Sequence, residues 1–175
     1  MPAPPPDDAF RRQLIDLLPR LRRFAYGLTR SLAEADDLVQ SACLRALEKR
    51  RQWQAGTRLD SWLFRIVQNL WIDGRRRLRH REEVDPDSLP LGDPSAHRTA
   101  EARLTLGAVE RLILALPVEQ RAVLMLATVE GMSYAETAAI LGIPQGTVMS
   151  RLSRARLALA AALDETGNAE GATGR

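Results

Sequence analysis

The segment that begins at Ser133 restricts the fold more than any other part of the chain. Ser133 and Glu136 have the spacing of a capping box, in which the serine hydroxyl accepts a backbone N–H and the glutamate reaches back to the serine N–H. Gly142 then ends a short run of helical periodicity, because glycine adopts the left-handed conformation without steric cost. A longer helix is predicted over Gln145–Leu163. A short helix, a glycine turn and a long helix are typical of a helix-turn-helix.

The polar side chains of the predicted second helix are donors of suitable length for base edges and phosphates. Ala138 is small where the two helices must cross, which favours close packing between them. A plain helical hairpin with a solvated arginine face is the alternative. Because the capping box, the glycine and the basic face occur together, we expect this segment to bind DNA. The candidate contacts are Gln145, Thr147, Ser150, Arg151, Arg154 and Arg156.

Residues 82–98 read EEVDPDSLPLGDPSAHR and interrupt the helical periodicity. Proline lacks a backbone donor and disfavours helix in the residue before it. We therefore predict a flexible, acidic, proline-rich linker at 82–99, between a helical domain at 1–81 and a second at 100–163, with a tail at 164–175. Neither side shows the alternation of β-strands, so the predicted fold class is all-α.

The spacing of apolar residues predicts the other helices. In the first domain we expect helices at Asp8–Leu18, Pro19–Thr29, Ala33–Lys49 and Leu59–Arg79, with a loop at Arg50–Arg58. The third of these should bury one apolar stripe, made of Leu38, Val39, Ala42, Cys43, Ala46 and Leu47. In the second domain we expect helices over Ala100–Ala115 and from Pro117 to Gly131, before the helix-turn-helix.

Positive charge is concentrated in the first domain. The chain has 25 basic and 22 acidic residues, and residues 1–81 hold 17 and 9 of these. The same residues hold seven of the eight aromatic side chains. Rings on which bases stack, with cations that follow the backbone, suit single-stranded nucleic acid. Trp62 has the spacing of a core residue, whereas Trp53, in the predicted loop, is either a base contact or part of the core.

Five arginines crowd the end of the predicted fourth helix, at positions 75, 76, 77, 79 and 81. The helix dipole favours cations at a C-terminus, but five in seven positions exceed what capping requires. Asn69 and Asp73 lie one turn apart beside this cluster, where they can orient it or contact bases.

Most enzymatic and metal-binding classes are excluded. The chain has no phosphate-binding glycine loop, no dinucleotide fingerprint and no zinc-protease motif. Asp36 and Asp37 are adjacent on a helix and diverge by about 100°, so they cannot converge on one ion. Cys43 is interpreted as a buried hydrophobe, with redox sensing as the alternative. We expect no catalytic residues, no metal and no cofactor.

The composition also indicates a compartment. One cysteine cannot form an internal disulfide and fits a reducing compartment. The N-terminus MPAPPPDDAF lacks the features of a secretion signal, and no apolar run reaches the about 18 residues that a membrane helix needs. We expect a cytoplasmic protein without membrane insertion of its own.

Three stretches carry a resemblance to a known family: DDLVQSACLRALEKRRQW, SWLFRIVQNLWIDGRRR and LPVEQRAVLMLATVEGMSYAETAAILGIPQGTVMSRLSRARLAL. They are similar to bacterial RNA polymerase sigma factors of the extracytoplasmic function (ECF) group, within the sigma-70 family. The first two resemble the family's domain 2 and the third resembles domain 4, in the expected order. The resemblance covers residues 10–81 and 105–160, and the acidic stretch lies where the family has a linker.

The resemblance implies a promoter-specificity subunit that binds core RNA polymerase and promoter DNA and catalyses nothing itself. It places polymerase contacts on the helix matching Ala33–Lys49, at Asp36, Asp37, Gln40 and Arg45. It implies a base-capture loop at Arg51–Arg58, with Gly56 and Thr57 as backbone donors. It assigns recognition of the −10 element to the helix matching Leu59–Arg77, at Asn69, Asp73, Arg76 and Arg77. The helix matching Gln145–Arg156 would enter the major groove of the −35 element.

Regulation is implied in the same way. The family's linker runs near the polymerase cleft and the RNA exit path, which suits an acidic segment; a solubilising linker is the alternative. Family members are usually restrained by an anti-sigma factor, so we expect such a partner. VEGMSYAETA and EADDLVQ are similar to the group that drives the general stress response. Two other classes compete with this interpretation. A stand-alone helix-turn-helix regulator would not explain the aromatic and basic first domain. A recombinase-like enzyme would need a nucleophile, which the sequence does not offer.

Overall fold

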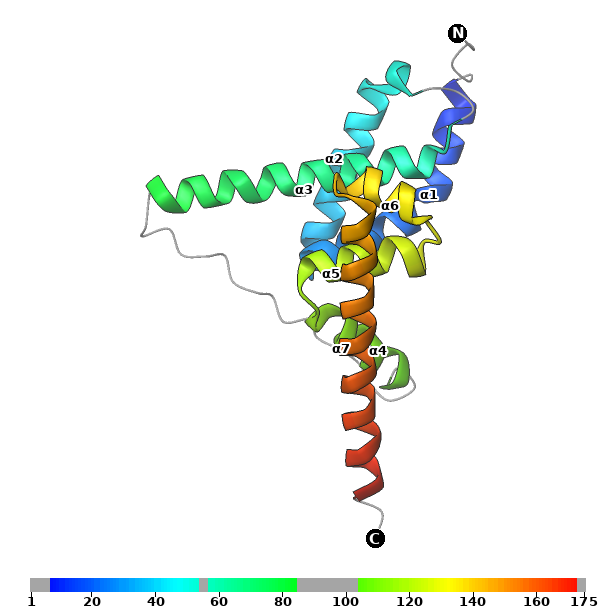
Figure 1. Ribbon diagram of the computed structural model, residues 1–175. Helices are drawn as coiled ribbons and strands as arrows, with labels where there is room; N and C mark the ends of the chain where they lie inside the picture. Colours follow the sequence, from blue (N-terminus) through cyan, green and yellow to red (C-terminus); the bar gives the residue numbers. More distant parts are fainter. Residues whose placement is uncertain (1–6, 54–56, 85–103, 173–175) are drawn as a thin grey trace. The chain divides into compact units, whose positions relative to one another are not determined.

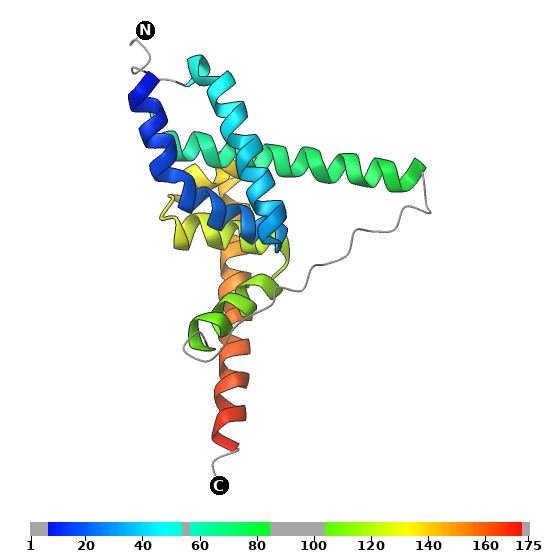
Figure 2. The same cartoon turned by 180° about the vertical axis from the view of Figure 1, so that it is seen from behind.

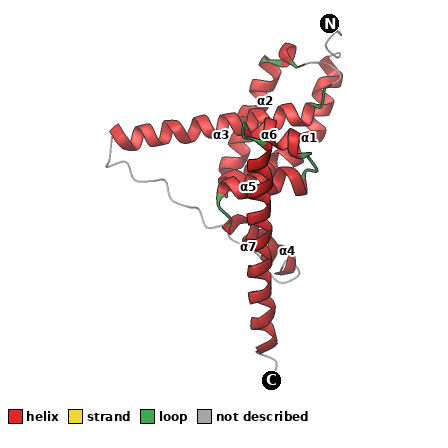
Figure 3. Cartoon of the chain, in the orientation of Figure 1, coloured by secondary structure: helices red, strands yellow, loops and turns green. Residues whose placement is uncertain are grey.

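The computed structural model describes residues 7–53, 57–84 and 104–172, and every regular element within them is helical (Figure 1; Figure 3). The predicted all-α class is therefore confirmed. The helices form two compact units, the first built on α1 to α3 and the second on α4, α5 and α7. The elements are α1 (Asp7–Thr29), α2 (Leu32–Glu48), a 3₁₀ turn η1 (Arg50–Gln52), α3 (Leu59–Val84), α4 (Leu104–Ala115), α5 (Val118–Leu124), a π-helical turn η2 (Met125–Val129), α6 (Tyr134–Leu141) and α7 (Gln145–Ala172).

α1 is one continuous helix, and the two short helices expected on either side of Pro19 were wrong. Proline removes one backbone donor from a helix. The apolar residues on both sides of Pro19 nevertheless lie on the same face, where Leu14, Leu21 and Phe24 are buried. Packing of this face against α2 and α3 outweighs the lost hydrogen bond.

The first unit is a three-helix arrangement in which α1 and α2 pack against each other and both contact α3 (Figure 2). Phe24 of α1 and Phe64 of α3 are fully buried and meet edge to face, with ring centroids 5.3 Å apart. Phe10 contacts both Trp53, at 5.9 Å, and Trp62, at 6.5 Å. Trp53 is therefore part of the core, which decides between the two interpretations of this side chain.

α2 begins after Ser31, whose hydroxyl accepts the backbone N–H of Glu34 at 3.3 Å. Its buried side chains are Ala35, Val39, Ala42 and Ala46. Leu47 does not belong to this stripe as expected, because it lies about 100° from Ala46 around the helix and remains 36% exposed. Cys43 is half-buried, and burial raises the pKa of its thiol.

α3 continues beyond the expected end at Arg79, through Val84. Leu59, Leu63 and Val67 anchor its first half, whereas Asp73 and Arg75 to His80 are exposed. The second half of α3 extends away from α1 and α2 (Figure 1).

The helix-turn-helix signals of the second unit are confirmed. Ser133 accepts the N–H of Glu136 at 3.2 Å, and the Glu136 carboxylate accepts the N–H of Ser133 at 2.8 Å. Gly142 has a φ of 66° and its N–H donates to the carbonyl of Ala138, which ends α6. α7 begins at Gln145 as expected but continues past Leu163 to Ala172.

The helix before this motif departs from regularity. Pro117 caps α5 instead of occupying its first turn, and η2 replaces the last turns expected before Gly131. Glu130 donates its N–H to Met125 O at 2.9 Å, the longer spacing of a π turn. Arg121 is 2% exposed and donates to the carbonyls of Leu114, at 2.8 Å, and Leu116, at 2.7 Å, so it caps the end of α4.

Some expectations fall outside the described residues: Gly56 of the predicted loop, most of the acidic linker, and the expected start of α4 at Ala100. Among the described helices, none has an apolar stretch of the length that crossing a bilayer requires. Within the same residues, no three His, Cys, Asp or Glu side chains are grouped to hold a metal ion.

Candidate nucleic-acid interfaces

α7 carries a polar face beside its buried side. Val148, Leu152 and Ala155 are buried, and Gly142 forms the turn between α6 and this helix. Because each residue turns an α-helix by about 100°, four candidate contacts lie within roughly 100° of one another, and Arg151 borders the buried Ala155. They are Thr147, Ser150, Arg151 and Arg154. The Ser150 hydroxyl donates to Thr147 O at 3.1 Å, so its oxygen is presented as an acceptor.

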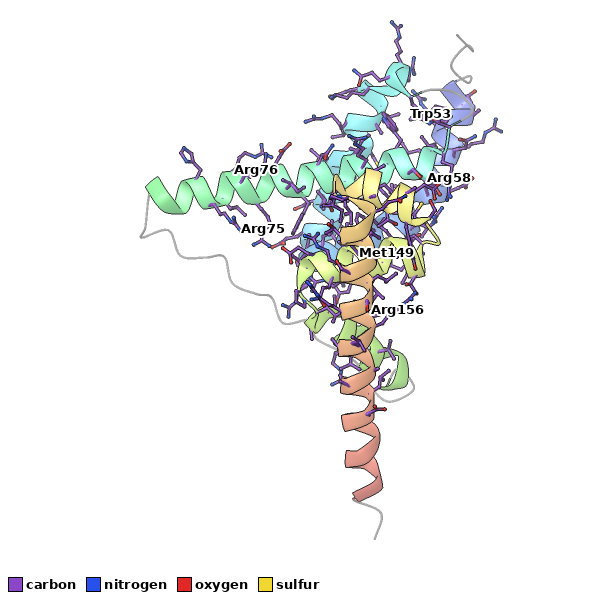
Figure 4. The ribbon with its side chains drawn as sticks, in the orientation of Figure 1. Trp53, Arg58, Arg75, Arg76, Met149 and Arg156 are labelled. Carbon is purple, nitrogen blue, oxygen red and sulfur yellow. The ribbon has the colours of Figure 1, made fainter. Side chains whose placement is uncertain are left out.

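Two other candidates on α7 are placed differently. Gln145 is exposed at the first residue of the helix. Arg156 is exposed but lies about 160° around the helix from Arg154. Figure 4 shows Arg156 and Met149 along the length of α7. Arg154 and Arg156 therefore lie on different faces of α7.

α3 carries a second polar face. Asn69, Asp73, Arg76 and Arg77 are all exposed, and their spacing places them within about 100° of one another. Leu63 and Val67, which are fully buried, form the packed side of the first half of the helix, and Asn69 lies about 160° around the helix from Val67. The fold thus brings the four predicted residues together on one solvent-facing surface. Arg65, which the sequence reasoning did not select, extends the same stripe toward the start of α3.

The arginine cluster at the end of α3 is divided between two faces. The Arg75 guanidinium lies 5.3 Å from the centroid of the Trp71 ring, a cation–π contact. Arg75 and Arg76 point to different sides of α3 (Figure 4). The stripe therefore contains Arg76 and Arg77, whereas Arg75 stacks on an aromatic ring elsewhere on the helix.

The exposed face of α2 carries the four residues assigned to partner binding. Asp37, Gln40 and Arg45 are exposed, while Asp36, also exposed, is paired with Arg22 of α1. Arg22 Nε lies 2.6 Å from Asp36 Oδ1 and Nη2 lies 2.8 Å from Oδ2. Leu44 is 58% exposed between these polar residues. Helical spacing already placed Leu44 outside the predicted apolar stripe, but spacing alone indicates exposure and not a binding role.

A cluster at the start of α3 was also missed. The carboxylate of Asp60 accepts hydrogen bonds from Arg58 and from Arg20 of α1. Thr57, one of the two predicted loop donors, is exposed immediately before it. Arg20 and Asp60 are forty positions apart, so no local spacing signals their contact.

The sequence and the fold of the chain match those of known proteins. Residues 14–81 match the family model described as Sigma-70 region 2, and residues 106–159 match that of Sigma-70, region 4. Over 159 residues the chain is 37% identical to the ECF RNA polymerase sigma factor EcfG of Rhodopseudomonas palustris (strain TIE-1), covering 91% of this chain and 87% of that protein. The chain belongs to the ECF sigma factors of RNA polymerase.

Further similarities lie within the same group. This ECF sigma factor is 41% identical over 143 residues to SigM of Mycobacterium tuberculosis (strain ATCC 25618 / H37Rv), covering 81% of this chain and 70% of SigM. Among solved structures it is similar to the sigma factor RpoE of Bartonella quintana, determined in complex with the anti-sigma factor NepR. That similarity has a TM-score of 0.76 and 34% identity, and covers 89% of this chain and 97% of that one. Sigma factors are transcription initiation factors and not enzymes.

Proposed function

We propose that this ECF sigma factor binds core RNA polymerase through the β and β′ subunits and directs initiation at specific promoters in the cytoplasm. In this proposal residues 1–81 and 100–163 act as domains 2 and 4, joined by the linker at 82–99. The exposed face of α2, with Asp36, Asp37, Gln40 and Arg45, contacts the polymerase. The exposure of Leu44 among these residues supports the assignment, because an apolar side chain in a polar surround favours protein partners.

The observation that carries the proposal is the stripe on α3. Asn69, Asp73, Arg76 and Arg77 share one solvent-facing side of α3, and only the first half of this helix is buried against α1 and α2. Amide and carboxylate groups can pair with base edges, while the arginines contact phosphates. We assign recognition and melting of the −10 element to this stripe, with backbone donors from Gly56 and Thr57 in the preceding loop. Base capture costs a few kcal/mol of unstacking, which binding to polymerase offsets.

The polar face of α7 is assigned to the −35 element. Recognition helices contact base edges through their N-terminal residues. Thr147 and Ser150 are therefore placed at the bases, and Gln145 is assigned to the bases from the first residue of the helix, about 160° around it from Thr147. Arg151, Arg154 and Arg156 follow along the helix and suit phosphates, with Arg156 directed to the other side.

Control by a protein partner is also proposed. The similar RpoE chain of Bartonella quintana was solved with an anti-sigma factor, which supports an anti-sigma factor for this chain. The motifs VEGMSYAETA and EADDLVQ support a role in a stress response. The acidic linker is assigned to the polymerase cleft on its charge alone.

The test is transcription in vitro. Purified full-length protein is added to core polymerase with a library of genomic fragments from the source organism, and the 5′ ends of the transcripts are sequenced. We expect a small set of start sites that share two upstream elements and vanish without the protein. DNA binding that needs no polymerase, with no start sites, would contradict the proposal.

A double variant provides the residue-level check. Arg76→Ala with Arg77→Ala should reduce permanganate reactivity of unpaired thymines near the start site more than it reduces duplex binding. The matched control is Arg111→Ala, an exposed arginine of α4 that donates to the carbonyl of Gly107. Equal permanganate reactivity with the double variant and with the control would show that Arg76 and Arg77 do not take part in melting the −10 element.

A further inference from the structure

One carboxylate organises the start of α3. Asp60 Oδ1 accepts Arg58 Nε at 3.1 Å and the backbone N–H of Ser61 at 2.8 Å. Its Oδ2 accepts Arg58 Nη2 at 2.8 Å and Arg20 Nη1 at 3.0 Å. The Asp60 side chain is only 11% exposed. Both oxygens are thus engaged, and the Arg58 contact is bidentate, the geometry that restricts a guanidinium most.

The charge state of this carboxylate follows from its surroundings. Burial raises the pKa of Asp60, but hydrogen bonds from Arg58, Arg20 and the Ser61 N–H outweigh it, so the pKa lies below its ordinary value. Asp60 is therefore ionised at neutral pH. Two guanidinium groups therefore donate to one ionised carboxylate at the start of α3.

The cluster is anchored to the core through α1. The Arg20 guanidinium lies 5.5 Å from the ring centroid of Phe64, a fully buried side chain of α3. The side chain of Arg20 is 29% exposed, whereas that of Arg58 is 48% exposed. The Asp60 carboxylate therefore links Arg20, which stacks on Phe64 and is less exposed, to the more exposed Arg58.

Arg58 occupies a particular position in the chain. It directly precedes α3, the helix that carries the −10 stripe. A free arginine side chain loses roughly 2 kcal/mol of rotamer entropy when it is immobilised. Its bidentate bond to a buried carboxylate immobilises it before any ligand arrives, while half of its surface remains in solvent.

We propose that Arg58 contacts a phosphate of the non-template strand at the −10 element, and that Asp60 is the positioning residue that aims it. This inference rests on the proposed function and adds two residues to the −10 surface. Phosphate is the chemistry that suits it, because a guanidinium pairs well with phosphate oxygens and phosphate contacts set the register of a strand. The side chain of Arg58 is 48% exposed, so a strand can reach it.

A purely architectural role for Asp60, in which it only ties α1 to α3, makes a different prediction. In that case replacing Asp60 weakens DNA binding whether or not Arg58 is present. If Asp60 acts through Arg58, its replacement has no further effect once Arg58 has been removed.

The experiment measures binding of holoenzyme, made from the full chain and core polymerase, to a forked promoter fragment. The fragment is duplex upstream and single-stranded across the −10 element, with the sequence of a start site that the unmodified protein itself produces. Affinity is measured by fluorescence anisotropy over a series of salt concentrations. The variants are Arg58→Ala, Asp60→Asn, both together, Arg58→Lys, and Arg111→Ala as the charge-matched control.

We expect Arg58→Ala to weaken binding by about tenfold, the cost of one charge-assisted hydrogen bond. The slope of log affinity against log salt should fall by about 0.7, the value for one phosphate contact on a single strand. Arg58→Lys should retain the slope but lose part of the affinity, because lysine lacks the bidentate fork. Asp60→Asn should weaken binding alone and have no effect in the Arg58→Ala background. Arg111→Ala should bind like the unmodified protein.

Two results would overturn the inference: an Arg58→Ala variant with unmodified affinity and slope, or an Asp60→Asn loss that persists in the Arg58→Ala background. Thermal unfolding of each variant identifies any that fail to fold. If Asp60→Asn is among them, the exposed Arg58 variants still decide the phosphate contact and Asp60→Glu replaces Asp60→Asn in the cycle. Failure of the proposed function is distinguishable, since the unmodified holoenzyme would then give no start sites.

Discussion

Arg22 of α1 holds the carboxylate of Asp36 of α2 with two nitrogens, at 2.6 and 2.8 Å. Both side chains are about half exposed, at 55% and 50%, so the pair contributes little to folding. Exposed pairs are typically worth about 0–1 kcal/mol. The relationship matters more for binding, because Asp36 is proposed to contact the polymerase and is already occupied within the protein.

Arg22→Ala should therefore leave the unfolding free energy within about 1 kcal/mol of the unmodified value. Affinity for core polymerase should rise, by up to several-fold, because the Asp36 carboxylate no longer has a competing partner, while Asp36→Asn should lower it. Competition binding against a labelled sigma factor measures both. Arg12→Ala, another exposed arginine of α1, is the control. An Arg22→Ala variant that binds as weakly as Asp36→Asn would show that the polymerase recognises the pair.

Gly142→Ala should destabilise the second unit by about 1–2 kcal/mol, since its φ of 66° disfavours a Cβ although no atom lies within 4 Å of where one would be. DNA binding at the −35 element should weaken together with stability, because Gly142 sets the turn between α6 and α7. Gly107→Ala is the matched control, a glycine of α4 with equal space and no positive φ. That change should stabilise by up to about 1 kcal/mol. Urea unfolding measures both, and opposite signs are the decisive result.

Arg121→Met should destabilise the second unit by about 3 kcal/mol. The change leaves the carbonyls of Leu114 and Leu116 without the buried, charge-assisted donor that they have now. Arg111→Ala, on the exposed side of α4, should change stability by less than about 0.5 kcal/mol. The comparison uses urea midpoints monitored by circular dichroism. A midpoint for Arg121→Met equal to that of the unmodified protein would exclude the capping role.

The depressed pKa of Asp60 gives stability a defined pH dependence. Since the pKa of Asp60 in the folded state lies below its ordinary value of 3.8, its contribution is complete above that value and is lost as the pH falls through the folded pKa. Asp60→Asn should therefore be less stable than the unmodified protein at pH 6, and the difference should narrow below pH 3.8. Thermal melts from pH 6 to pH 2.5 measure it. A difference that stays constant across the range would contradict this assignment.

Arg151→Ala and Arg154→Ala should each lower the salt slope of duplex binding at the −35 element by about 0.9. Because the slope counts phosphate contacts, the double variant should lose about 1.8. Ser150→Ala, on the same polar face of α7 without a charge, should change base preference at constant slope. Fluorescence anisotropy of the holoenzyme with a −35 duplex measures the slopes. An unchanged slope in the double variant would show that Arg151 and Arg154 do not contact phosphates.

Local signals explain why much of this fold was predictable. The capping box at Ser133 and the left-handed Gly142 are each decided by a few neighbouring residues, and both were confirmed. Helical spacing singled out Asn69 and Asp73 beside the arginine cluster, but the assignment of all four residues to one site came from the family resemblance and stays a proposal. Pro19 was misread as a break, because its local effect is opposed by packing with two distant helices.

Contacts between distant residues account for what the sequence did not indicate. The pairing of Arg20 with Asp60 and the burial of Arg121 depend on how helices meet, which spacing within one helix does not encode. The lengths of α3 and α7 were underestimated for another reason. Exposed polar helix has no apolar period to mark where it ends.

The second half of α3 is a helix held by its own backbone. From Arg75 to His80 every side chain is exposed, so no tertiary packing protects the amides there. Isolated helical segments of this length are marginal in water. Amide hydrogen exchange in the free protein should therefore quicken from Phe64 toward His80, and a bound promoter strand should slow it most where it was fastest. Ordering this segment would then take up part of the binding free energy, which makes the affinity of the −10 contact adjustable through helix propensity alone.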